Sequence, residues 1–239
     1  MSTRHPFRTR RTRFTGFSLV ELLVVVAIIG IIGSIAVPAV GSLLKGSSLT
    51  QAANLLTDQA ALARQWALSR NRVVELRFYR IADPEQPGEV ATDPTTGYFR
   101  AFQFFEIAQQ GIPNPVGKIT TLPTNVIMSS SATLSTLLSQ SNASGAAPFA
   151  VSMGQLQQND PELPRGVLKN YNYVAFRFLP DGTTNLPPTA NGSSAQWFLT
   201  VHILSDMPKT NGGANPPPNF FTWTIDPISG ASKILRPSL

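Results

Sequence analysis

The chain carries two hydrophobic patterns, one after the other. Residues 22–44 are almost all apolar and none is charged. An uncharged apolar run of more than about 18 residues is typical of a membrane-spanning helix, and at a rise of about 1.5 Å per residue this run covers roughly 34 Å. Residues 49–70 instead repeat apolar and small side chains at three- and four-residue spacing, which predicts an amphipathic helix. The predicted buried stripe consists of Ala52, Leu56, Gln59, Ala60, Ala63 and Ala67, widened by Leu55, Leu62 and Trp66.

From Arg72 onward the period changes to two. Val74, Leu76 and Phe78 alternate with polar or amphipathic residues, as expected for a half-buried strand. Similar runs follow at residues 98–107, 173–179, 197–204, 221–225 and 232–235. Turn-forming residues at 180–182 and 226–230 separate the later runs, and polar or proline-rich insertions occupy residues 83–97, 129–164 and 210–219. The pattern predicts an α+β fold, in which a long N-terminal helix packs on a mostly antiparallel β-sheet.

The basic charge is concentrated at the N-terminus. The chain has 19 basic and 13 acidic residues, a net charge of +6. Residues 1–16 contain no acid and five arginines, which are Arg4, Arg8, Arg10, Arg11 and Arg13. By the positive-inside rule this end stays in the cytoplasm, and the chain after Lys45 is exported. The rest of the chain, residues 17–239, contains 14 basic and 13 acidic residues and is nearly neutral. The net charge of the whole chain is therefore weak evidence for nucleic-acid binding.

Glu21 is the only charged residue between residues 16 and 40. A carboxylate inside an apolar helix costs a few kcal/mol unless it has a partner, which favours a functional role. The alternative is that Glu21 lies near the membrane interface and reaches the headgroups. Gly16 and Phe17 precede it at the end of the basic segment, and Pro38 follows within the apolar run.

This arrangement resembles the type IV pilin and pseudopilin family. In that family the precursor is cut after a glycine and the new N-terminal residue is methylated, which implies cleavage between Gly16 and Phe17 and methylation of Phe17. If Phe17 is the first mature residue, Glu21 is the fifth, where the family carries its glutamate. Pro38 is then the twenty-second, where many members carry a proline that bends or locally melts the helix. The resemblance implies that Glu21 and Pro38 act in assembly, with Glu21 pairing with the amine of a neighbouring subunit.

The family implies three segments. Residues 1–16 form a cleaved basic leader, residues 17–44 a transmembrane and filament-core helix, and residues 45–239 a periplasmic globular domain whose helix continues to about residue 70. The segments ALARQWALSRNRVVELRF and FRFLPDGTT resemble those of H-type minor pseudopilins of type II secretion and related minor type IV pilins. Expected partners are the prepilin peptidase and methyltransferase, other pilins or pseudopilins, and the inner membrane, which the protein crosses once before it enters a filament.

Other interpretations stay open. An ordinary secretory signal peptide, cut near Ala36 or Ala39, would leave a soluble exported domain, although such a peptide has no reason to contain Glu21. DNA or substrate binding is a second alternative. Its candidate residues are Arg64, Arg70 and Arg72, with Arg77 and Arg80 nearby.

The sequence offers no site for an enzyme. It contains no cysteine and two histidines, His5 and His202, and none of the common hydrolase, nucleotide-binding or zinc-protease motifs. We therefore expect no catalytic residue, metal or cofactor. The segments at residues 93–97 and 226–230 share a DPxxG pattern that favours β-turns over calcium ligation.

Overall fold

The computed structural model describes residues 18–83, 85–89, 97–109, 111–138, 152–155, 170–190, 193–194, 196–207 and 216–237. Of these, it leaves out the side chains of residues 35–40, 42, 152–155, 170–172, 189–190 and 193–194. The helices are α1 (Leu19–Arg70) and the short 3₁₀ helix η2 (Leu204–Asp206). The strands are β1 (Val74–Ile81), β2 (Tyr98–Ile107), β3 (Pro113–Thr121), β4 (Val126–Met128), β5 (Ser152–Gln155), β6 (Asn170–Phe178), β7 (Thr189–Ala190), β8 (Ser193–Ser194), β9 (Trp197–Ile203), β10 (Phe220–Ile225) and β11 (Ser232–Leu235). The chain divides into two compact units, Met1–Leu44 and Lys45–Leu239.

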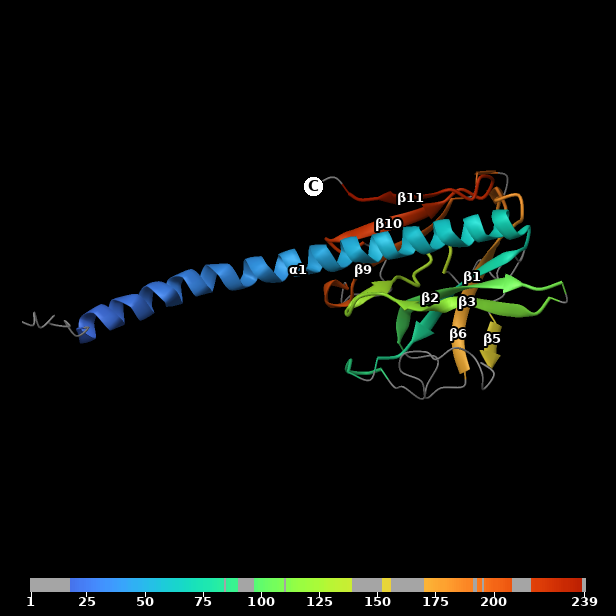
Figure 1. Cartoon of the computed structure of the whole chain (residues 1–239). Helices are drawn as coiled ribbons and strands as arrows, with labels where there is room; N and C mark the ends of the chain where they lie inside the picture. The colour runs from blue at the N-terminus through green and yellow to red at the C-terminus, as the bar shows by residue number, and fades with distance from the viewer. Residues whose placement is uncertain are drawn as a thin grey trace, which may run out of the picture. The chain divides into compact units, whose positions relative to one another are not determined.

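The second unit is built on one nine-stranded sheet. Its strand order is β11-β10-β9-β4-β2-β1-β6-β5, and β3 pairs with β2 outside this path. The pairs are antiparallel. The part of α1 that follows Lys45 crosses this sheet, and β10 and β11 run alongside it (Figure 1). The predicted α+β class, with a mostly antiparallel sheet, is confirmed.

The core lies between α1 and one face of the sheet. The buried α1 side chains of this core are Leu49, Ala52, Ala53, Leu56, Ala60, Ala63 and Ala67. Most of the predicted stripe is therefore correct, and Gln59 is half-buried. The prediction for Leu62 is wrong, because its side chain is 42% exposed. Leu62 is rotated by about 100° from Ala63, which carries it off the buried face.

Strand β1 is buried on both faces, whereas the sequence predicted a half-buried strand. Its first face, with Leu76 and Phe78, joins the main core. On the other face Glu75 is only 6% exposed, and Tyr79 belongs to a second apolar cluster. Glu75 tolerates burial because its two carboxylate oxygens accept hydrogen bonds from the Nε atoms of Arg77 (2.7 Å) and Arg177 (2.9 Å).

All six predicted strands are present, and the bounds of β2 and β11 agree with the prediction. The strands that the sequence did not predict are short or locally unfavourable. Strand β3 contains Pro113, Pro115 and Gly117, residues that strands normally avoid. Its proline residues are tolerated because β3 pairs on one side only, with β2. Strand β4 has three residues and is held by β2 and β9.

The two predicted turns are confirmed, and they lie against each other. In the first, Gly182 N–H donates to Leu179 O (2.8 Å), and in the second Gly230 N–H donates to Asp226 O (2.8 Å). Both glycines have positive φ angles, and a Cβ on Gly230 would clash with Gly182 O. Arg64 of α1 donates from Nε to the carbonyl oxygens of Gly182 (3.1 Å) and Ser229 (3.0 Å). One arginine therefore joins both turns to the helix.

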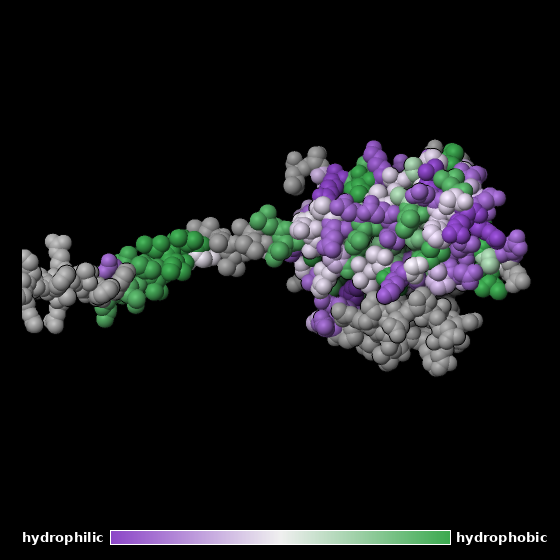
Figure 2. Space-filling model, in the orientation of Figure 1, coloured by the Kyte–Doolittle hydropathy of each residue, from purple (hydrophilic) through white to green (hydrophobic). Residues whose placement is uncertain are grey.

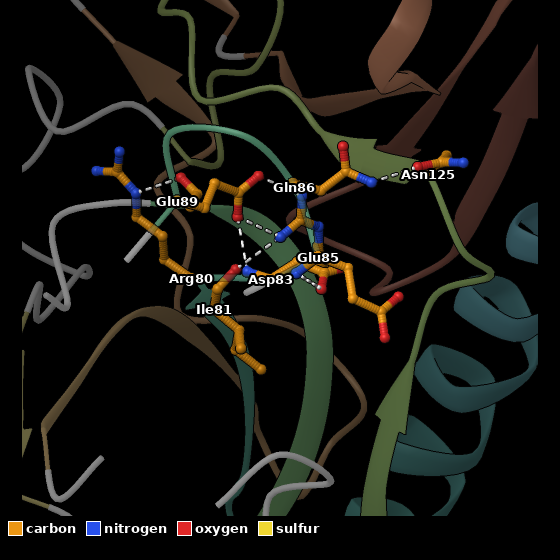
Figure 3. A network of polar contacts seen from close by, with 9 residues as sticks. Arg80, Ile81, Asp83, Glu85, Gln86, Glu89 and Asn125 are labelled. Atoms are coloured by element: carbon orange, nitrogen blue, oxygen red, sulfur yellow. Dashed lines mark hydrogen bonds and ion pairs between the residues drawn. The ribbon is translucent and has the colours of Figure 1, made fainter. Parts of the chain in front are cut away.

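Part of the predicted insertion at residues 83–97 is tied to the sheet (Figure 3). The Glu89 carboxylate accepts two 2.6 Å hydrogen bonds from the guanidinium of Arg100 on β2. It also accepts one from Asp83 N–H (2.7 Å). Gln86 Nε2 donates to Asn125 Oδ1 (2.9 Å). The described residues of this loop are thus held by a partly buried ion pair and hydrogen bonds.

The burial of His202 predicts that the domain is less stable in acid. His202 is 2% exposed, and its Nδ1 lies 3.0 Å from Ile203 O, as expected for a satisfied strand residue. Burial lowers the pKa of His202 below its ordinary 6.5. Below about pH 6.5 the unfolded chain therefore binds a proton that the folded chain does not bind. The free energy of unfolding decreases as the pH falls through this range, by at most about 1.4 kcal/mol per pH unit.

The measurement is chemical denaturation of the full chain in detergent at about pH 7.5 and about pH 5.5. We expect His202→Gln, which keeps a polar side chain but does not titrate, to lose less stability between these values than the parent chain. Equal losses in the two proteins would contradict this role for His202.

Candidate functional site

The sequence places the candidate site at the N-terminal end of α1. Gly16 and Phe17 lie outside the described residues. Glu21 lies in the first turn of α1, and Pro38 lies further along the same helix. The structure therefore gives the surroundings of Glu21 and the backbone conformation at Pro38, and it does not test the cleavage and methylation positions.

Glu21 and Ser18 cap the start of α1 reciprocally. Glu21 N–H donates to Ser18 Oγ (3.2 Å), and Ser18 N–H donates to Glu21 Oε2 (3.4 Å). This capping box satisfies two of the backbone donors that the first turn of a helix leaves without partners. It also holds a carboxylate at the positive end of the helix dipole. In the single chain, Glu21 is thus directed toward its own N-terminus.

Sequence reasoning did not single out Ser18. The signal was available, because a serine followed three residues later by a glutamate, just before an apolar run, is the capping-box pattern.

The N-terminal part of α1 exposes apolar side chains. Each large hydrophobic residue from Leu19 to Ile32 is 44–81% exposed. Figure 2 shows these side chains as a nearly continuous hydrophobic surface. On length and hydropathy, no helix made of the described residues qualifies as a membrane span. An apolar surface of this extent is typical of an interaction site.

The helix continues through Pro38. The backbone is helical from Leu19 to Arg70 without a break. A proline inside a helix removes one backbone donor and crowds the preceding turn. That Pro38 bends the helix, or locally melts it in the filament, stays a prediction.

The five arginines of the suggested basic cluster do not share one environment. Arg64 binds two turn carbonyls, and Arg80 Nε donates to Gly97 O (2.9 Å). The guanidinium of Arg70 lies 4.9 Å from the centre of the Trp66 ring, and Arg72 is half-buried.

Arg77 is held between the rings of Phe105 (4.1 Å) and Tyr173 (4.7 Å), and it pairs with Glu75. Burial opposes its charge, but Glu75 outweighs this effect and raises the pKa of Arg77. Three of the five arginines therefore bind acceptors within the fold.

The second DPxxG segment forms a β-turn, as predicted. The Asp226 carboxylate accepts hydrogen bonds from Ser229 Oγ (2.5 Å), Ser229 N–H (3.2 Å) and Ile228 N–H (3.3 Å). The bond from the Ser229 hydroxyl is the main cause that lowers the pKa of Asp226. The first DPxxG segment lies outside the described residues except for Gly97. Within the described part of the chain, no group of three or more histidine or acidic side chains is placed to hold a metal.

Comparison with known proteins identifies the N-terminal segment. Residues 11–37 match the family described as the prokaryotic N-terminal methylation motif. The matched range contains Gly16, Phe17 and Glu21 and ends one residue before Pro38. The prepilin-type N-terminus predicted from the sequence is thereby confirmed. No curated protein matches the chain.

Two solved structures of the minor pseudopilin EpsH, from the type 2 secretion system of Vibrio cholerae, are similar to the chain. Both share 12% sequence identity with it. The first has a TM-score of 0.39 and covers 80% of this chain and 99% of its own, and the second has a TM-score of 0.37 and covers 81% and 97%.

The capping box predicts that Ser18 limits fraying at the start of α1. Replacing a serine N-cap by alanine costs about 1 kcal/mol, which corresponds to a roughly fivefold faster exchange of the protected amide. We expect Ser18→Ala to accelerate hydrogen exchange at Glu21 N–H by this factor in the full chain. Ser34→Ala is the matched control, since Ser34 Oγ donates to Ile31 O (2.7 Å) and caps no helix end. Equal exchange in both variants would show that Ser18 is not a cap.

Proposed function

We propose that this chain, which carries the prokaryotic N-terminal methylation motif, is a structural subunit of a filament. It acts as a minor pilin or pseudopilin of a type IV pilus or a type II secretion pseudopilus. The match over residues 11–37 is the observation that carries the proposal. The α+β fold, with α1 packed on an antiparallel sheet, is consistent with it.

Maturation would be performed on the chain by other proteins. A prepilin peptidase would hydrolyse the peptide bond between Gly16 and Phe17 and release the basic leader. The Phe17 nitrogen would then become a free amine, to which the methyltransferase would transfer a methyl group from a methyl donor. The proposal assigns the chain itself no catalytic residue and no cofactor.

The surroundings of Glu21 support a role in assembly. Its carboxylate is held at the start of α1 by Ser18, one residue from the position where cleavage would create the Phe17 amine. In an apolar environment the amine of a neighbouring subunit would be a stronger partner than the Ser18 amide, because both members of the new pair are charged. Exchange of the intrachain partner for the interchain one would favour a single register between helices.

The exposed apolar surface of α1 supports the same role. The side chains from Leu19 to Ile32 need either lipid or other helices around them to be buried. Gly30 and Gly33 have no atom within 4 Å of a Cβ position, which leaves room for a neighbouring helix to approach closely. We propose that the chain spans the inner membrane once, with residues 45–239 in the periplasm, and enters the filament from there.

The arginine contacts do not favour the alternative of DNA binding. Arg64, Arg77 and Arg80 bind acceptors of the fold, and the guanidinium of Arg70 lies against the Trp66 ring. We therefore assign the globular domain a role in contacts between subunits.

The proposal predicts that Gly16→Ala blocks processing. In a host that contains a prepilin peptidase, we expect this variant to stay at full length in the membrane fraction, because a side chain at Gly16 obstructs entry of the extended backbone into the protease. Intact mass and N-terminal sequencing measure the outcome. Gly30→Ala is the control and should be cut normally.

A methylated N-terminus at Phe17, lost only in Gly16→Ala and in a peptidase-null host, supports the proposal. Normal mature protein from Gly16→Ala would contradict it. A start after Ala36 or Ala39 would instead identify a signal peptide.

The proposal also predicts that Glu21→Gln separates processing from assembly. The amide is nearly isosteric with the carboxylate but cannot form an ion pair with the Phe17 amine. We expect normal cleavage and at least about a tenfold loss of the protein from the sheared filament fraction. Glu85→Gln, which removes an exposed carboxylate of the globular domain, should assemble normally. Normal assembly of Glu21→Gln would exclude the ion pair.

A further inference from the structure

We propose that a groove between α1 and the start of β11 binds a neighbouring subunit that is a different pilin-like protein and not a second copy of this chain. The occupant would be an apolar side chain, flanked by a carboxylate, on the globular domain of that subunit. This inference rests on the proposed function and adds a specific contact surface to it.

The groove is a hollow of about 430 Å³ beside the buried face of α1. One wall consists of Thr57, Ala61, Arg64 and Leu68, with Gln65 beside them, and residues 230–232 form the other. The α1 residues recur at three- and four-residue spacing, so they form one flank of the helix over about 16 Å. Most of the lining surface is apolar.

The walls of the groove are fixed before any partner binds. Arg64 ties Gly182 O and Ser229 O to the helix, and Gly230 lies directly against Gly182 O. Asp226 closes the second turn through hydrogen bonds to Ser229. A preformed site loses little conformational entropy on binding, so even a modest contact area can give useful affinity.

One charged side chain shows what the occupant should carry. Arg64 is the only charged residue of the lining, and its described hydrogen bonds use Nε alone, which leaves its terminal nitrogens available. A carboxylate near the groove would complement the arginine, and an apolar side chain would fill the rest.

The exposed edge of the same region enlarges the apolar surface. Leu68 is 43% exposed, and Ile228, at the tip of the turn that Asp226 closes, is 66% exposed. An isoleucine on a rigid turn is a suitable contact for a partner, since turns usually carry polar residues. Both side chains would be covered by a domain docked over the groove.

Addition of a partner strand to β11 fits this region less well. Strand β11 has four residues, Lys233 in it is exposed, and Pro237 follows two residues after its end. Short length, lysine and proline are features that protect an edge strand against pairing. The groove, and not the strand edge, is therefore the surface that we assign to the partner.

The test is site-specific photo-crosslinking of the full chain in its native host. We place p-benzoylphenylalanine at Ala61, in the groove, and as a control at Ala132, which is exposed and does not line it. We expect Ala61 to crosslink to another protein with a prepilin-type N-terminus, through a peptide of its globular domain that contains an acidic residue beside an apolar one. Ala132 should not give this product.

A pair of charge variants tests the role of Arg64 without removing it. Ala231 is exposed in the groove wall, so both Ala231→Glu and Ala231→Lys can be accommodated. If the partner brings a carboxylate, Ala231→Glu should repel it and reduce the yield of the crosslink at Ala61 by at least about tenfold. Ala231→Lys should leave that yield nearly unchanged. Equal effects of the two substitutions would overturn the assignment of an acidic occupant.

The N-terminal mass of the same samples separates the two proposals. Chains that start at Phe17 but give no crosslink at Ala61 would overturn the groove assignment alone, and so would a crosslink to a second copy of this chain or to a protein without a prepilin-type N-terminus. Chains that are not processed would overturn the proposed function and, with it, the groove assignment.

Discussion

The close packing of a small-residue helix face on a sheet rich in aromatic residues is the interaction on which the globular domain depends. Ala52, Ala60, Ala63 and Ala67 are at most 2% exposed, so the helix backbone lies close to the strands. Large side chains on the strands fill the space that the alanines leave. The fully buried aromatic residues of this core are Phe78, Phe102, Phe176, Phe178, Phe221 and Trp223. Because the protein has no disulfide, this packing must supply most of its stability.

The same packing explains why polar contacts gather at the edges of the helix. Arg64 fastens two turns beside one flank, and Lys45 pairs with Asp206 of η2 (2.6 Å) at the start of the second unit. Trp66 packs on the core from the other flank, and its Nε1 donates to Glu106 (2.8 Å). These side chains set the position of α1 on the sheet, since alanine contacts alone would permit the helix to slide. Arg64, which the sequence offered as a candidate for nucleic-acid binding, thus fastens two turns to the helix through its Nε.

At the N-terminal end of α1 the apolar side chains are exposed, whereas those that face the sheet after Lys45 are buried. The side chains from Leu19 to Ile32 are apolar and exposed, and the carboxylate of Glu21 is placed among them. The capping box with Ser18 gives this charge a local role in the single chain. It also leaves the charge at the end of the helix, where a new cationic partner could reach it. A charge that would be costly in the middle of the apolar run is tolerated at its start.

The sequence by itself determined the features that depend on period and spacing. The apolar run, the amphipathic helix to Arg70 and six of the strands could be predicted because each pattern repeats over several residues. The spacing of Gly16, Phe17 and Glu21 indicated the N-terminal motif for the same reason.

Only the tertiary structure decided which side chains had partners. It placed Gly182 and Gly230 in contact although 48 positions separate them in the sequence, and it buried Glu75 by bringing Arg177 to it from another strand. It also formed β3 and β4, whose weak local preferences are compensated by strand pairing, and exposed Leu62 despite its apolar character. Local patterns record which backbone conformation each segment prefers, whereas contacts between distant segments arise only when the chain closes around a common core.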